Sequence, residues 1–255
     1  MAVLSAFRAD LHIHTCLSPC GELDMSPRGI VEAALAKNLD IIAICDHNTA
    51  ENVAAAFRAA ERIGRLKVLA GLEVSSAEEV HVLTLFDSPE TAEDMQALVY
   101  DHLPPRTNRP EVFGEQVMAN EDDEVEGFNE RLLIGATDLD LNTVVEEAHK
   151  RGGLAIASHV DRQSFSLLGQ LGFVPEGLAL DGFEISAFAD LEQILSQYPE
   201  LANRPILKNS DAHFVDDIGS AFTEFYLAKP DLAEIKMALK NENGRTINKI
   251  FSRRS

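Results

Sequence analysis

Two histidines spaced two residues apart, in Asp10-Leu11-His12-Ile13-His14, are the first residues of this sequence that could do chemistry. Because side chains alternate across a β-strand, His12 and His14 are expected on one face, with Leu11 and Ile13 on the other. Two imidazoles on one face of a strand can bind the same metal ion side by side. The pair alone is weak evidence, so the other histidines and carboxylates of the chain decide the question.

Strand and helix signals alternate along almost the whole chain. We expect strands at residues 8–14, 41–45, 67–73, 80–86, 153–159, 180–185, 205–210 and 221–227. Expected helices lie at 24–37, 49–63, 88–100, 141–151, 164–170, 190–197 and 230–240. Repeated strand–helix units predict an α/β fold with a parallel sheet, first as a closed or distorted (β/α) barrel and second as an open, doubly wound sheet. Only about six residues separate the strands near 73 and 80, too few for a parallel crossover, so these two should form a hairpin.

Histidines and carboxylates collect where the expected strands end. Six of the eight histidines fall in this set, and the candidate metal ligands are His12, His14, His47, Glu73, His81, His159, Asp211 and His213, with Cys20 in the loop after His14. In a parallel barrel the functional groups lie at the carboxyl ends of the strands. Imidazole mixed with carboxylate suits Zn, Fe or Mn, and this many donors exceeds the three or four that one ion needs. The pattern therefore predicts two or three divalent ions, an arrangement that supports displacement at phosphorus by a metal-bound hydroxide.

Composition limits the possible partners. The formal net charge of -20 disfavours loose electrostatic binding to nucleic acid or to anionic membranes, but it allows a small phosphorylated substrate or a nucleotide. No stretch approaches the ~18 apolar residues of a membrane span, and the first residues do not look like a secretory signal. Three cysteines in a chain of 255 residues favour a reducing compartment. We therefore expect a cytoplasmic protein.

Residues 103–136 interrupt the alternation with three prolines and the acidic run Glu121-Asp122-Asp123-Glu124. We interpret this segment as an insertion into a single domain that spans 1–255. It should form a small hairpin that caps the site, with the acidic run as a solvated turn. Because loops above a barrel vary while the floor stays fixed, we expect the insertion to select the substrate.

The combined motifs resemble the PHP (polymerase and histidinol phosphatase) domain family. The matching segments are Asp10–Thr15, Cys45–Asn48, Gly71–Val74 with His81, Ala157–His159 and Asn209–His213, in the order of the family. The resemblance implies a distorted (β/α)7 TIM-like barrel in which one ion is held by His12, His14, Glu73 and Asp211. It also implies that Glu73 bridges to a second ion near His81 and that His47 and His213 serve a further one, while His159 matches a ligand position. The family usually has Asp or His where this chain has Cys20-Gly21, so that Cys20, Glu22 or Asp24 would have to substitute.

The resemblance also suggests which residues act on the substrate. Arg162, three residues after His159, matches a position that contacts substrate phosphate, and guanidinium pairs well with phosphate oxygens. Lys208 and Asn48 are weaker candidates for substrate binding, and Glu73 and His213 join Arg162 as candidate catalytic residues. We expect a metal-dependent phosphoesterase that acts on phosphomonoesters or on nucleotide and oligonucleotide ends. The alternatives are a metal-binding scaffold or sensor without turnover, an enzyme like histidinol phosphatase, and a hydrolase of the amidohydrolase kind, which would need a lysine at a strand end.

Overall fold

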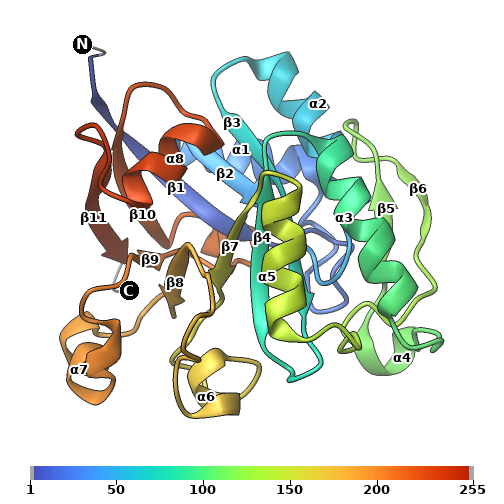
Figure 1. The fold of residues 1–255 in the computed structure, drawn as a ribbon. Coiled ribbons are helices and arrows are strands. Elements are labelled where there is room, and N and C mark those ends of the chain that lie inside the picture. Colours follow the sequence, from blue (N-terminus) through green and yellow to red (C-terminus); the bar gives the residue numbers. More distant parts are fainter. Residues whose placement is uncertain (1–2, 253–255) are drawn as a thin grey trace.

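A sheet of nine strands, curved toward a barrel, forms the centre of the computed structural model, which describes residues 3–252 (Figure 1). The strands lie in the order β11-β10-β1-β2-β3-β4-β7-β8-β9. Their bounds are Ser5–Ile13 (β1), Ile41–Ile44 (β2), Lys67–Ser75 (β3), His81–Phe86 (β4), Leu154–Ala157 (β7), Gly182–Ile185 (β8), Ile206–Lys208 (β9), Ala221–Leu227 (β10) and Thr246–Ser252 (β11). The short apolar strands β2 and β7 are buried along their whole length, as expected for interior strands.

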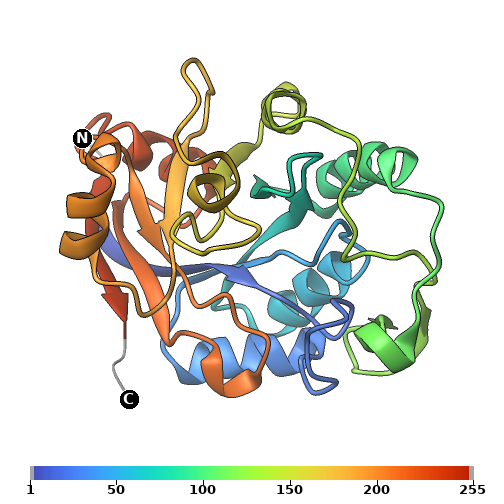
Figure 2. The ribbon, with the colours of Figure 1, turned by 90° about the horizontal axis from the view of Figure 1, so that it is seen from below.

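The two ends of the sheet approach each other and nearly close the barrel. Next to β9, the Lys208 N–H donates to Thr223 Oγ1 of β10, and this hydroxyl donates to the Lys208 carbonyl, both at 2.9 Å. Just beyond, the His14 N–H donates to the Ala212 carbonyl at 3.0 Å, which ties the end of β1 to the segment after β9. Seen from below, the strands curve around a common centre (Figure 2). The predicted distorted barrel is therefore confirmed, and the alternative of an open, doubly wound sheet is not.

Four pairings depart from a strictly parallel sheet. Strands β3 and β4 form the predicted hairpin, with Ser75 opposite His81. Strand β4 is also antiparallel to β7, and β10 is antiparallel to both β1 and β11. Strand β11 is absent from the predicted set because Asn248 and Lys249 interrupt its apolar residues. It pairs only with β10 and adds a ninth strand.

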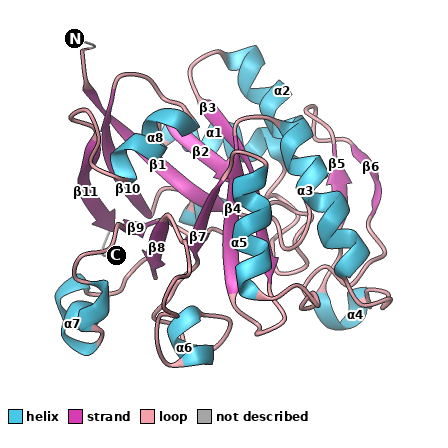
Figure 3. Ribbon diagram, in the orientation of Figure 1, coloured by secondary structure: helices cyan, strands magenta, loops and turns pink. Residues whose placement is uncertain are grey.

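The helices lie around the sheet (Figure 3). They are Pro27–Ala36 (α1), Val53–Ile63 (α2), Pro89–His102 (α3), Pro110–Phe113 (α4), Leu141–Lys150 (α5), Leu167–Leu171 (α6), Leu191–Gln197 (α7) and Leu232–Leu239 (α8), with 3₁₀ turns at Pro199–Leu201 and Val215–Asp217. Helix α1, expected at 24–37, begins at Pro27, and Ser26 is its N-cap because Ser26 Oγ accepts the Gly29 N–H at 3.2 Å. Among the described residues no helix combines the length and the apolar character that a membrane span requires.

Apolar residues pack on both faces of the sheet. The larger core lies between the sheet and helices α1, α2, α3 and α5. The smaller core fills the barrel with residues such as Leu11, Ile41 and Leu85 and includes Leu232 and Ile235 of α8. In Figure 1, α8 lies beside the region where β1 and β2 begin. That end of the barrel is therefore covered, and the opposite end remains for a site.

The insertion contains the predicted hairpin, formed by β5 (Val117–Ala119) and β6 (Val125–Phe128). It packs beside α2, where Asn52 Nδ2 donates to the Val117 carbonyl at 3.0 Å. Its acidic turn is exposed at Asp122, Asp123 and Glu124, as predicted. The turn also forms ion pairs with Arg58 and Arg62 of α2, with Arg58 Nε 2.7 Å from Glu121. Opposite charges on neighbouring elements explain these additional contacts.

Candidate metal centre

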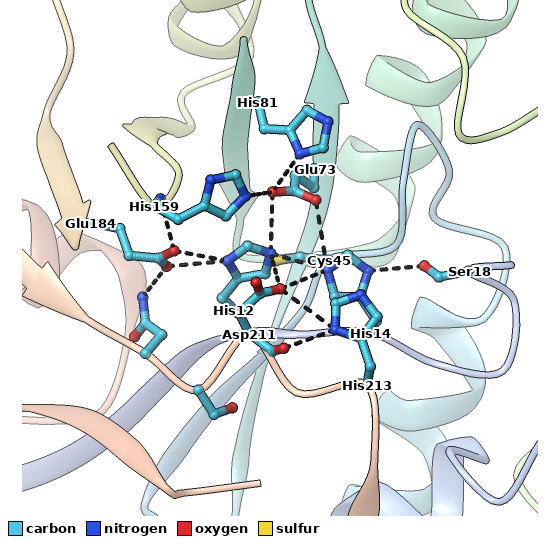
Figure 4. A network of polar contacts seen from close by, with 12 residues as sticks. His12, His14, Ser18, Cys45, Glu73, His81, His159, Glu184, Asp211 and His213 are labelled. Atoms are coloured by element: carbon cyan, nitrogen blue, oxygen red, sulfur yellow. Dashed lines mark hydrogen bonds and ion pairs between the residues drawn. The ribbon is translucent and has the colours of Figure 1, made fainter. Parts of the chain in front are cut away.

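The predicted metal ligands converge at one end of the barrel (Figure 4). Each comes from the end of a strand or from the loop that follows, and the set is His12 and His14 (β1), His47 (after β2), Glu73 (β3), His81 (β4), His159 (after β7), and Asp211 and His213 (after β9). All are buried except Asp211 and His213, which are partly buried. The hairpin β3–β4 brings His81 to the same end as Glu73, as its short connection predicts. The residues selected because they follow predicted strands therefore lie together in the structure.

His12 of β1 and His14, the residue directly after β1, present their Nε2 atoms to each other at 3.1 Å. The opposite ring nitrogens are both engaged: His12 Nδ1 lies 3.1 Å from the carboxylate of Glu184, and His14 Nδ1 lies 2.9 Å from Ser18 Oγ. Since a carboxylate can only accept, His12 Nδ1 carries a proton that it donates to Glu184. Ser18 Oγ donates its own proton to Asp46 at 2.6 Å, so His14 Nδ1 also acts as the donor. These contacts leave the two Nε2 atoms available for one shared cation.

Carboxylate oxygens complete the surroundings of this pair. Asp211 Oδ1 lies 3.3 Å from His12 Nε2 and 3.2 Å from His14 Nε2. Glu73 lies between several imidazoles: its Oε1 is 3.4 Å from His12 Nε2, and its Oε2 is 3.6 Å from His14 Nε2. Metal bonds of ~2.1 Å at roughly a right angle separate two ligand atoms by about 3 Å. The spacing of these four residues therefore fits one ion.

Glu73 also faces a second group of histidines. Its Oε1 is 3.1 Å from His81 Nδ1 and 3.2 Å from His159 Nε2, and its Oε2 is 2.9 Å from His47 Nδ1. Although both lie close to the Glu73 carboxylate, neither His81 Nδ1 nor His47 Nδ1 forms a hydrogen bond of acceptable geometry, and both atoms are buried. Buried polar atoms are almost always satisfied, so orphaned imidazole nitrogens at a carboxylate point to a bound cation.

The donor atoms divide into three compact groups, in each of which they lie within 4.8 Å of one another. The groups are His12/His14/Glu73, His47/Glu73/His81 and His14/His47/His213. Imidazole and carboxylate are donors that Zn, Fe and Mn accept. The residues present therefore fit two or three divalent ions, with Glu73 shared by two groups.

The charges of the cluster favour a cation as well. Burial lowers the pKa of His12, but the carboxylates of Glu184, Asp211 and Glu73 outweigh it and hold the pKa well above its usual value. Burial raises the pKa of Glu73, but the imidazoles of His81 and His12 hold it well below its usual range. Burial and the neighbouring His213 hold the pKa of His14 well below its usual value. A proton on His12 would balance one carboxylate, whereas divalent ions would balance all of them.

Cys20 lies beside the third group but outside the compact sets. Burial raises the pKa of its thiol, but hydrogen bonds with His213 and His47 outweigh it and lower the pKa to about 6. Cys20 and the alternatives Glu22 and Asp24 are all exposed residues. Of the three, Cys20 is the one whose side chain is within hydrogen-bonding reach of His213 and His47.

A cavity of about 200 Å³ opens above the cluster. This volume is several times the ~30 Å³ of one water molecule, so a phosphoryl group fits. Its lining residues are His47, Glu73, His81, Ile134, His159, Arg162, Ser164, Phe165, Asp211 and His213. Ile134 is the one lining residue from the insertion, and no residue of its hairpin lines the cavity. Of the insertion that was predicted to cap the site, only the segment around Ile134 reaches the cavity.

Of the three predicted substrate-binding residues, only Arg162 lines the cavity. Arg162 lines the cavity, is 45% exposed in its side chain and pairs with Asp211. Lys208 points elsewhere, because its Nζ donates to the Ala189 carbonyl at 2.7 Å. Asn48 is fully buried, and its Nδ2 donates to the carbonyls of Leu133 and Gly135 at 2.7 and 2.8 Å. The structure thus places Lys208 and Asn48 outside the cavity lining, since sequence position does not fix side-chain direction.

Residues absent from the predicted set support the ligands from behind. Glu184, near the end of β8, accepts from His12 Nδ1, from the His159 N–H at 3.1 Å and from Asn209 Nδ2 at 2.7 Å. Glu184 lies at an expected strand end, so the strand-end rule itself could have found it. No comparable signal marks Ser18, whose role depends on the folding of the loop after β1.

Two of the candidate ligands adopt a backbone conformation that residues other than glycine rarely adopt. His159 and Asp211 have φ angles of 28° and 51°. Such left-handed residues persist where the surroundings enforce them, which is common at functional sites. The remaining histidines lie elsewhere, His102 against Asp138 and His149 against Asp181.

Comparison with known proteins agrees with this site. The family model of the PHP domain matches residues 10–172, and that of the PHP-associated region matches 197–243. YqxK of Bacillus subtilis (strain 168) is 32% identical over 116 residues, which cover 44% of this chain and 29% of that protein. A 5'-3' exoribonuclease of Haemophilus influenzae (strain ATCC 51907 / DSM 11121 / KW20 / Rd) is 26% identical over 191 residues, 59% of this chain and 68% of that one.

Two solved structures share the fold. The lesion-specific endonuclease PfuEndoQ of Pyrococcus furiosus superimposes with a TM-score of 0.76 at 19% identity, over 97% of this chain and 59% of that one. A protein described as a metal-dependent phosphoesterase from Bifidobacterium adolescentis ATCC 15703 gives 0.55 at 22% identity, over 88% and 89%. This chain thus spans less than a third of YqxK and about three fifths of PfuEndoQ. Since the PHP model covers well over half of the chain, this protein belongs to the PHP domain family.

Proposed function

We propose that this protein hydrolyses phosphoesters at nucleotide or oligonucleotide ends, with two or three divalent ions (Mn, Fe or Zn) in the cluster described above. The observation that carries the proposal is the His12–His14 pair. Two Nε2 atoms lie 3.1 Å apart while both Nδ1 atoms are engaged by Glu184 and Ser18. A proton shared by this pair would leave the orphaned nitrogens of the second group unsatisfied, whereas bound ions would satisfy both.

The donor groups suggest how the ions would be shared. His12, His14, Glu73 and Asp211 would hold one ion, and Glu73 with His81 and His159 would hold a second. His47 and His213, with Cys20 beside them, would hold a third. Bound there, such ions supply an activated water and stabilise the charge that develops on phosphoryl oxygens.

Other residues of the cavity would bind and orient the substrate. Arg162 offers a guanidinium that matches phosphate oxygens, and its contact with Asp211 keeps it at the edge of the cluster. His213 Nδ1 donates to the Asp211 carbonyl at 2.8 Å, so the other ring nitrogen can hold a proton or a ligand at the cavity. Glu184 and Ser18 keep the rings of His12 and His14 in the required tautomer.

The matched relatives include an exoribonuclease and an endonuclease, which supports a phosphoester of the nucleic-acid class. Two properties of this chain favour a nucleotide end over an extended nucleic acid. The net charge of -20 opposes a long phosphate backbone, and the cavity is small. A single terminal phosphate at a local cationic centre meets both constraints. The three cysteines are free thiols, which supports the proposed cytoplasmic location.

The test combines metal content with phosphate release. Protein purified without chelator should contain two to three equivalents of Mn, Fe or Zn by elemental analysis. It should release phosphate from adenosine 5'-monophosphate or from a 5'-phosphorylated oligonucleotide. His12→Ala should lower both metal content and turnover, while His102→Ala, at a surface histidine, should change neither. Near-zero metal that does not increase on reconstitution, or full metal without release of phosphate from any phosphoester, would contradict the proposal.

A further inference from the structure

Phe165 is an aromatic residue in the lining of the cavity, and it is 46% exposed. Its ring stacks on the ring of His81, with centroids 5.1 Å apart and an interplanar angle of 25°. Its carbonyl accepts the His81 N–H at 3.1 Å. These two contacts fix the ring relative to the metal centre and leave part of it open to the cavity.

The loop that carries Phe165 is held in a strained conformation. Phe165 has a φ angle of 56°, which is rare for a bulky side chain. Ser166 Oγ donates to the Arg162 carbonyl at 2.5 Å and accepts the Gly169 N–H at 3.0 Å. The Arg162 N–H in turn donates to the His159 carbonyl at 3.0 Å. One constrained loop thus presents both a guanidinium and an aromatic ring to the cavity.

Phe165 and Ile134 are the two apolar residues in the cavity lining. All the other lining residues are polar, and most belong to the metal cluster. A phosphate group uses cations and hydrogen-bond donors, so it gains nothing from an apolar wall. A flat aromatic group attached to that phosphate would gain contact with the ring of Phe165.

We propose that Phe165 determines specificity by stacking on the nucleobase of a nucleotide whose phosphate lies at the metal centre. This inference rests on the proposed function and names the feature of the substrate that the site recognises. Stacking on an aromatic side chain tolerates every base and needs no positive charge. It therefore suits a chain with a net charge of -20 that cannot rely on general electrostatic attraction.

The test compares a phosphate ester that has a base with one that lacks it. Binding of the hydrolysis-resistant methylenephosphonate analogues of adenosine 5'-monophosphate and of ribose 5-phosphate is measured by calorimetry on metal-loaded protein. The wild type should bind the adenosine analogue at least tenfold more tightly. Phe165→Ala should remove about tenfold or more of this preference and leave the affinity for the ribose analogue within twofold. Phe165→Tyr, which keeps a ring, should retain the preference.

Phe173→Ala is the matched control, because Phe173 is also exposed (58%) but does not line the cavity. It should leave both affinities unchanged. Equal losses for the two analogues in Phe165→Ala would mean that Phe165 acts only through His81, and would overturn the inference. A wild type without preference would do the same. Because binding is measured without turnover, failure of the proposed hydrolysis would be seen separately, as absent phosphate release.

Discussion

Replacement of Glu184 by glutamine should weaken metal binding at the His12–His14 pair although Glu184 is not a proposed ligand. Its carboxylate accepts from three donors: His12 Nδ1, the His159 N–H and Asn209 Nδ2. Glutamine has nearly the same shape but keeps one oxygen and turns the other into an NH₂ group. That group would face a donor, so at least one of the three hydrogen bonds must be lost.

The size of the effect can be worked from these contacts. A hydrogen bond to a charged group contributes about 1.5–3 kcal/mol. At 1.4 kcal/mol per factor of ten, the loss of one corresponds to roughly 10- to 100-fold in affinity. This agrees with the 10- to 100-fold typical of removing a group that orients a metal-binding histidine.

Competition for Zn²⁺ with a chromophoric chelator measures the affinity directly. Glu192→Gln, at an exposed glutamate of α7, makes the same chemical change away from the site and should have no effect. Circular dichroism of the metal-free Glu184→Gln protein should show an intact fold. An affinity within twofold of the wild type, in a folded variant, would refute the role of Glu184 in orienting His12.

Four further outcomes are expected. Metal binding should release protons and strengthen with rising pH. The reason is that burial lowers the pKa of His12 but Glu184 and other carboxylates outweigh it and hold this pKa well above 6.5. Calorimetry in buffers of different ionisation enthalpy measures the proton release. In metal-free protein the same raised pKa of His12 contributes to the free energy of unfolding. This contribution is complete below about pH 6.5 and is lost as the pH rises through the higher pKa of the folded state. Urea unfolding between pH 6 and 9 would detect the loss. Gly71→Ala should lower the free energy of unfolding by about 1–3 kcal/mol, since the added Cβ would lie 2.8 Å from Cys45 Sγ, and an unchanged urea midpoint would contradict this packing. Asp10→Ala should lower the free energy of unfolding, because the Ser210 N–H and the Gly219 N–H lose the carboxylate that accepts from them. The expected loss is about 1–3 kcal/mol for each N–H group, measured by urea unfolding at pH 5.

The barrel and most of the cluster could be predicted because both depend on local patterns. Apolar runs such as that of β2 fix the strands, and parallel strands place their carboxyl ends at one edge. Because His47 and His159 follow strands of the same sheet, they lie at the same edge of it as His12. The short connection before His81 added the hairpin that brings this histidine to Glu73.

What the sequence could not provide is the direction of individual side chains. Lys208 and Asn48 adjoin ligand motifs, yet the first donates to a carbonyl of a neighbouring loop and the second to carbonyls of the insertion. Likewise, the sequence predicts that Glu121 is solvated, and only the structure shows its ion pair with Arg58 of α2. Such contacts join residues far apart in the sequence, so no local pattern contains them.

The acidic chain and its proposed anionic substrate are compatible only if the ions are part of the binding site. Glu73, Asp211 and Glu184 place three carboxylates in one buried cluster, and Arg162 is already paired with Asp211. Without divalent ions this cluster would repel a phosphate, because like charges at short distance in a poorly solvated site interact strongly. The ions would therefore be needed to bind the substrate as well as to activate water, and metal-free protein should not bind phosphate at all.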